Sequence, residues 1–96
     1  MRIRWSPDAV ADLEGIVEYI RRDDPAVAQR IGQAIYDRLS VLGTFPHAGR
    51  LGRIEGTREF PLPPLPFIVV YRAIVNTDTV EIVNIIHGAQ RWPPEG

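Results

Sequence analysis

The chain has 96 residues, 45% of them hydrophobic and 24% charged, which is typical of one soluble globular domain spanning residues 1–96. It contains no cysteine, which excludes disulfide bonds and thiolate metal sites. The net charge is −1 and all eleven basic residues are arginines, so a strongly basic nucleic-acid-binding domain is excluded but a local arginine patch is not. No membrane span and no signal peptide are recognisable, so we expect a cytoplasmic protein.

The first half of the chain predicts one strand and two helices. Polar and apolar residues alternate over residues 2–5, as in a short strand. Ser-Pro at residues 6–7 and Asp-Pro at residues 24–25 are helix start signals, and Gly43 is a stop signal. The apolar stripes at helical spacing are Val10, Leu13, Ile16, Val17 and Ile20, then Val27, Ile31, Ala34, Ile35, Leu39 and Leu42. We expect two amphipathic helices that pack on a sheet.

The second half of the chain predicts three strands. Glycine and proline mark residues 45–56 as a loop, and residues 57–62 form a strand whose proline favours an edge position or a strand end. Residues 67–75 and 79–87 are rich in β-branched and aromatic side chains, and a turn separates them at residues 76–78. The order β-αα-βββ predicts an α+β domain with a helical hairpin packed on a small antiparallel sheet.

The strand that begins at Phe67 is apolar on both faces, whereas two helices can cover only one face of a sheet. We therefore expect the second face to expose apolar surface unless something covers it. The C-terminal tail, a second copy of the chain and a different protein partner are the three candidates for that cover.

The residues that could carry chemistry are an Arg/Glu/His set. The two histidines are 40 residues apart and the serines fall in predicted helices or caps, so neither a metal site nor a serine triad is indicated. Metal-free RNA cleavage would use Glu55 or Glu59 as base, His87 as acid, and Arg58 or Arg91 on the phosphorane. The structural alternative is that Arg58 and Glu59 form cross-strand ion pairs and that His87 is a hydrogen-bonded histidine at a strand end.

A series of short motifs follows the chain in order. They are Asp12-Leu13, Ile16 and Tyr19-Ile20 after Ser6, then Phe45-Pro46-His47-Ala48-Gly49-Arg50, Gly56-Thr57-Arg58-Glu59, residues 66–72 and residues 85–93. The ordered set resembles the RelE/ParE superfamily of toxins from bacterial type II toxin–antitoxin modules, and within it the ParE-like, plasmid-stabilisation branch. The resemblance covers nearly the whole chain. It implies the same small α+β fold and a cytoplasmic toxin that the C-terminal segment of a cognate antitoxin holds inactive.

The resemblance also implies an activity. ParE-like members poison DNA gyrase, and RelE-like members cleave mRNA on the ribosome. The lack of lysine and the ending at residues 87–92 resemble the ParE-like branch, which implies a gyrase poison without cofactor or metal. The alternatives are a RelE-like mRNA endonuclease and an inactive paralogue that only binds an antitoxin. Antitoxin contacts are expected at Phe67, Val69 and Tyr71. Target contacts are expected at Arg50, Arg53, Arg58, Arg72, Arg91 and Trp92.

Overall fold

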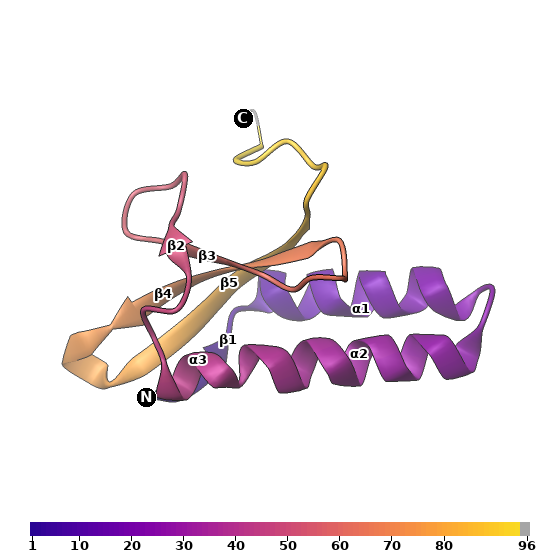
Figure 1. Cartoon of the computed structure of the whole chain (residues 1–96), viewed down its shortest axis with the longest axis horizontal. Coiled ribbons are helices and arrows are strands. Elements are labelled where there is room, and N and C mark those ends of the chain that lie inside the picture. Colours follow the sequence, from indigo (N-terminus) through magenta and orange to yellow (C-terminus); the bar gives the residue numbers. More distant parts are fainter. Residues whose placement is uncertain (95–96) are drawn as a thin grey trace.

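The computed structural model describes residues 1–94, which form a five-stranded sheet with a helical hairpin on one face (Figure 1). The predicted α+β fold with a helical hairpin on the sheet is confirmed. The elements are β1 (Arg2–Trp5), α1 (Pro7–Arg21), α2 (Pro25–Leu39), α3 (Val41–Thr44), β2 (Arg50–Leu51), β3 (Arg58–Pro61), β4 (Phe67–Ile74), the 3-10 turn η1 (Val75–Thr77) and β5 (Thr79–His87). No helix within residues 1–94 is long and apolar enough to span a membrane.

Both long helices start at the predicted caps. The Ser6 hydroxyl accepts from the backbone N of Ala9 at 3.0 Å, and the Asp24 carboxylate accepts from the backbone N of Val27 at 3.2 Å. The second helix differs from the prediction because it breaks at Ser40 and resumes as α3, which runs through Gly43. The Ser40 hydroxyl donates to a backbone carbonyl of the preceding turn, a bond that competes with regular helical geometry.

The sheet has the strand order β1-β5-β4-β3-β2. β1 runs parallel to β5, and every other pair is antiparallel, so the sheet is mixed and not wholly antiparallel. The α1–α2 hairpin separates β1 from the other strands in the sequence, so β1 can lie at the edge of the sheet and run parallel to β5. The two-residue strand β2, inside the predicted loop, was not expected because glycines on either side conceal so short a strand.

The main core lies between the helices and one face of the sheet. Ile35 and Leu39 of α2 meet Val69 and Tyr71 of β4 in one cluster, and each is at most 1% exposed. On the other face, the chain after β5 rises on the side away from the helices (Figure 1). Val70 of β4 is fully buried there, as is Ile86 at 2% exposed. The second face is therefore less open than the apolar pattern predicted.

Candidate functional site

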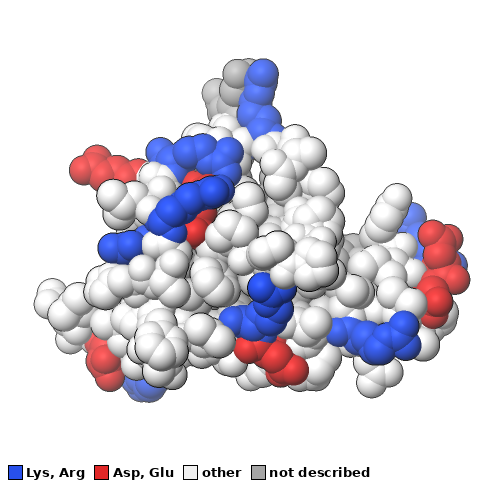
Figure 2. All heavy atoms as spheres, in the orientation of Figure 1, with Lys and Arg blue, Asp and Glu red and all other residues white. Residues whose placement is uncertain are grey.

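Two arginines converge on one buried carboxylate, that of Glu59 in β3, and we call Arg50, Arg53 and Glu59 the arginine cluster (Figure 2). Glu59 Oε1 accepts from Nη2 of Arg53 at 2.8 Å and from Nη2 of Arg50 at 3.3 Å. Glu59 Oε2 accepts from the backbone N and Nε of Arg53 at 2.9 and 3.1 Å. The Glu59 side chain is 1% exposed, against 58% for Arg50 and 45% for Arg53. The cluster buries its negative charge and presents its positive charges to solvent.

The ionisation of Glu59 follows from these contacts. Hydrogen bonds from the Arg53 side chain lower the pKa of Glu59 from 4.5 to about 2, although burial alone would raise it. A general base works best with a pKa near the working pH, so Glu59 is unsuited to the role of base that its sequence context suggested. The cross-strand ion pair expected of Glu59 exists, because Arg50 lies opposite it on β2, and Arg53 of the following loop is a second partner. Arg58 instead donates to the carbonyl of Gly49 at 2.9 Å.

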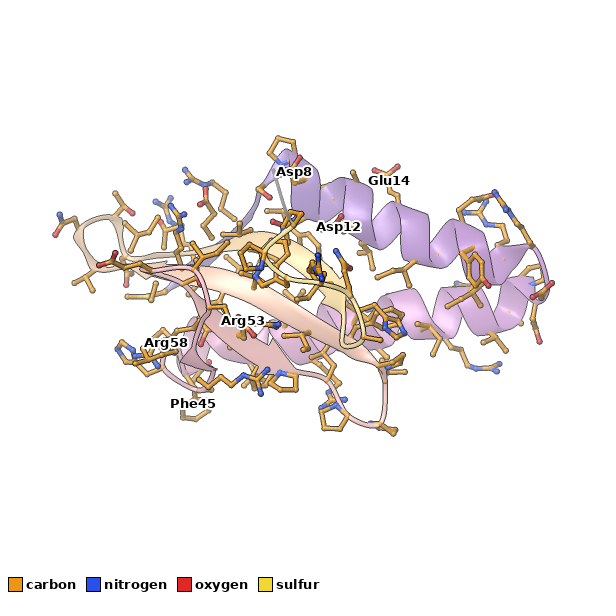
Figure 3. All side chains as sticks on the ribbon, turned by 90° about the horizontal axis from the view of Figure 1, so that it is seen from above. Asp8, Asp12, Glu14, Phe45, Arg53 and Arg58 are labelled. Carbon is orange, nitrogen blue, oxygen red and sulfur yellow. The ribbon has the colours of Figure 1, made fainter. Side chains whose placement is uncertain are left out.

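A groove of about 540 Å³ lies between α1 and the ends of β4 and β5. Its lining is largely apolar. The carboxylate of Asp12, the imidazole of His87 and the amide of Gln90 are polar groups in it. Figure 3 shows Asp12 on the side of α1 that faces the sheet. The other lining residues are Ala11, Gly15, Ile16, Tyr19, Ile20, Pro66, Phe67 and Ile85. The groove offers an apolar surface that is open enough to receive a protein side chain or helix.

The strand edge beside this groove is closed by side chains. β1 pairs with β5 only as far as Ile82, which leaves the outer edge of β5 without a strand neighbour beyond that residue. The Asp12 carboxylate accepts from the backbone N of Ile85 at 2.9 Å, and the side-chain Oε1 of Gln90 accepts from the backbone N of His87 at 3.1 Å. Because these donors are already used, a ligand in the groove meets apolar side chains and not an open strand edge.

His87 stands at the end of β5 and lines the groove. Its ring packs edge-on against Phe67, with 5.8 Å between ring centroids and 89° between ring planes. Its Nδ1 accepts from the backbone N of Ala89 at 3.0 Å, which fixes the orientation of the imidazole. This is the hydrogen-bonded histidine at a strand end that the structural alternative described.

The structure does not assemble the proposed nuclease residues. His87 pairs with Phe67, whereas Arg58 pairs with Tyr71, four residues further along β4, or roughly 13 Å at 3.3 Å per residue. Glu59 pairs with Val70 and shares its face of the sheet. Val69 and Tyr71 lie in the core under the helices, so Val70 between them, and Glu59 with it, point to the face away from the helices. His87, Glu59 and Arg58 therefore lie apart, on both faces of the sheet.

The expected antitoxin contacts need a correction. Val69 and Tyr71 are 0% exposed, because their side chains belong to the core under the helices, so neither can touch a partner in this conformation. The Tyr71 hydroxyl accepts from the backbone N of Gly49 and donates to the carbonyl of Pro46, both at 2.8 Å. Tyr71 therefore holds the loop after α3. Only Phe67 of the three is partly exposed, and it lines the groove.

The expected target residues are distributed over the molecule. Arg72 is exposed on β4 and lies opposite Glu81 in the sheet register. The Glu81 carboxylate accepts from Arg4 at 2.8 Å. Arg91 is exposed in the tail, and Trp92 is half-buried with an Nε1 atom that has no hydrogen-bond partner within residues 1–94. Over the same residues, no group of three or more His, Cys, Asp or Glu side chains could hold a metal ion.

Asp12 and Gln90 are the groove residues that the sequence did not single out for a role. Asp12 was placed outside the apolar stripe of its helix, yet it lies three residues after Ala9 and four before Ile16, on the same side of the helix. That spacing is the signal that could have identified it. Gln90 gives no comparable signal, because its role depends on a tight turn after β5.

The fold is that of a small α+β domain with an apolar groove beside its helical hairpin. A family model described as the ParE toxin of the type II toxin–antitoxin system parDE matches residues 3–92, and the chain belongs to this family. It is 41% identical over 92 residues to Y4kP of Sinorhizobium fredii, covering 96% of this chain and 93% of Y4kP. It is 33% identical over 89 residues to toxin RelE2 of Caulobacter vibrioides, and the match covers 93% of this chain and 97% of RelE2. A solved chain from the chromosomal ParDE system of P. aeruginosa is similar with a TM-score of 0.80 and 27% identity, covering 91% and 95%.

Proposed function

We propose that this ParE-family toxin poisons DNA gyrase and that a cognate antitoxin, seated in the groove beside α1, neutralises it. The observation that supports the first part is the separation of His87 from Glu59 and Arg58, so these three residues cannot act together in RNA cleavage. A poison acts by binding and needs no such site. Both targets, gyrase and the ribosome, place the toxin in the cytoplasm.

The groove supports an antitoxin partner by its chemistry. Its apolar lining and the 73% exposed Tyr19 at α1 are suited to the apolar face of an antitoxin helix. The similar P. aeruginosa structure comes from a ParDE toxin–antitoxin system, which supports the same kind of partner. A stable interface of this kind would bury at least about 1,000 Å² in total, so contacts would extend beyond the groove.

A second candidate function is ribosome-dependent mRNA cleavage, as in the RelE-like toxins. The 33% identity to RelE2 of Caulobacter vibrioides supports this second candidate. Cleavage by this chain would require His87 to act with groups that now lie on other parts of the sheet.

The target is tested with the purified chain in two parallel assays, gyrase-mediated breakage of plasmid DNA and ribosome-dependent mRNA cleavage. We expect DNA breaks, and we expect Arg91→Ala and Trp92→Ala to lower the yield of breaks by about tenfold, the loss of one strong contact. His87→Ala should leave breakage unchanged, and Arg30→Ala at an exposed position of α2 serves as the arginine control.

The opposite pattern would decide for the nuclease. In that case mRNA cleavage would be clear, gyrase would be unaffected, and His87→Ala would lose about 10²-fold in cleavage rate, as expected when a general acid is removed. That result would overturn the gyrase proposal.

The groove is tested with Gly15→Arg. A Cβ at Gly15 would meet no atom within 4 Å, and arginine is a better helix former than glycine, so the fold should tolerate the change. The long side chain would occupy the groove, and we expect at least about tenfold weaker binding of the antitoxin encoded by the neighbouring reading frame. Gln29→Arg, exposed on α2, is the control. Equal affinity for both variants would exclude the groove as the antitoxin site.

A further inference from the structure

The arginine cluster has hydrogen-bonding capacity that its internal contacts do not use. Within residues 1–94 the Arg50 guanidinium bonds through Nη2 alone, and the Arg53 guanidinium through Nε and Nη2. The remaining N–H groups, Nε and Nη1 of Arg50 and Nη1 of Arg53, stay available on side chains that are 58% and 45% exposed. The cluster as a whole carries two positive charges and one negative charge, so it retains a net charge of +1.

We propose that Arg50 and Arg53, held together by Glu59, form a binding site for a phosphate group. This goes beyond the proposed gyrase activity and does not depend on it. Guanidinium groups bind oxyanions through parallel N–H donors, and the two here meet at a single carboxylate oxygen. A phosphate offers three oxygens and close to two negative charges at neutral pH, so it can bond both arginines at once. A carboxylate, with two oxygens and one charge, satisfies fewer of the free donors.

The loop that carries the arginines is fixed before any ligand binds. The backbone N of Gly52 donates to the carbonyl of Thr57 at 2.8 Å, and the Thr57 hydroxyl donates to the carbonyl of Ile54 at 2.6 Å. A Cβ at position 52 would collide with Thr57 Oγ1, so this turn requires glycine. Arg53 adds a backbone and a side-chain bond to the same Glu59 carboxylate. Binding therefore needs little further ordering of the loop, which favours affinity.

Glu59 acts in this site as a positioning residue, and the direction in which its replacement changes phosphate affinity tests this role. If Glu59 were only a competing negative charge, replacing it with Gln would raise the local charge and tighten phosphate binding. If Glu59 orients the two guanidinium groups, the same replacement releases them and weakens binding despite the added positive charge. The two roles predict opposite changes in affinity for one variant.

The test follows the Arg Nε–H resonances of the ¹⁵N-labelled full chain by NMR during titration with sodium phosphate at pH 7.4 and constant ionic strength. Sodium acetate is the parallel arm, and a short DNA duplex is the third. We expect phosphate to shift the Arg50 and Arg53 resonances saturably and to bind at least about tenfold more tightly than acetate. A backbone phosphodiester has only two free oxygens and one negative charge, so we expect the duplex to shift these resonances less than phosphate does. A duplex that binds as tightly as phosphate would overturn the preference for a terminal phosphate group.

Variants connect the signal to the cluster. Arg53→Gln and Arg50→Gln should each weaken phosphate binding at least about tenfold, whereas Arg30→Gln on α2 should leave it unchanged. Glu59→Gln should weaken it by a similar factor. Equal affinity for acetate and phosphate, or unchanged phosphate binding in Arg53→Gln, overturns the site, and tighter or unchanged binding in a folded Glu59→Gln overturns the positioning role. Arg50 makes a single bond of 3.3 Å to Glu59, so Arg50→Gln tests the site even if Glu59→Gln or Arg53→Gln does not fold.

Discussion

Replacing Ile35 with Ala is expected to lower the free energy of unfolding by about 2–5 kcal/mol. Ile35 is fully buried in α2 and belongs to the cluster that includes Leu39, Val69 and Tyr71. Truncation removes three carbons from a site that the helix and the sheet close on both sides, so the surroundings can fill the cavity only in part. A domain of this size has about 5–15 kcal/mol of stability in total, and the loss would be a large share of it.

Urea unfolding followed by circular dichroism measures this loss directly. The matched control is Gln29→Ala, an exposed position on the same helix, which should stay within about 0.5 kcal/mol of the parent chain. A loss below about 1 kcal/mol for Ile35→Ala would mean that α2 does not pack on the sheet as described.

The arginine cluster should make the free energy of unfolding depend on pH in the acidic range. Because the pKa of Glu59 falls from 4.5 in the unfolded chain to about 2 in the folded one, the folded state binds this proton less readily. The contribution of Glu59 is therefore complete above about pH 4.5 and is lost as the pH falls toward 2. The shift corresponds to about 3 kcal/mol at 1.36 kcal/mol per unit, and solvent screening of the half-exposed arginines reduces it to about 2–3 kcal/mol.

The measurement is the free energy of unfolding at several pH values for the parent chain and for Glu59→Gln. The other carboxyl groups titrate in both proteins, so the difference between the two curves isolates Glu59. We expect that difference to shrink by about 2–3 kcal/mol between pH 6 and pH 2. Parallel curves would show that the ion pairs of Glu59 contribute nothing to folding.

Local signals explain why much of the fold was predictable. The helix starts at Ser6 and Asp24 need only side chains and backbone within one turn, and the strand over residues 79–87 has the composition of a buried strand along its whole length. The parallel pairing of β1 with β5 had no such signal, because the partners are separated by most of the chain. The break at Ser40 depends on one hydroxyl bond, which the apolar stripe conceals.

The candidate site was predictable in its residue types and less so in its arrangement. Arg50 and Arg53 were expected at a binding surface, and they are exposed. Their shared partner Glu59 was expected to be a base or a member of a cross-strand ion pair, without its partners being identified. Sequence neighbours point to opposite faces of a strand, so the partner of Glu59 had to come from a different element. That element was β2 with its loop, which the sequence did not reveal.

The pairing of the first strand with the last also determines when this protein can become active. Within residues 1–94 the only sheet neighbour of β1 is β5, and Asp12 of α1 likewise reaches its backbone partner at Ile85. A nascent chain that has not yet reached residue 79 has no strand to receive its N-terminus, and its first helix lacks the strand whose backbone Asp12 bonds. Formation of the native sheet must wait until β5 has been synthesised. A message that is interrupted before that point yields no folded toxin.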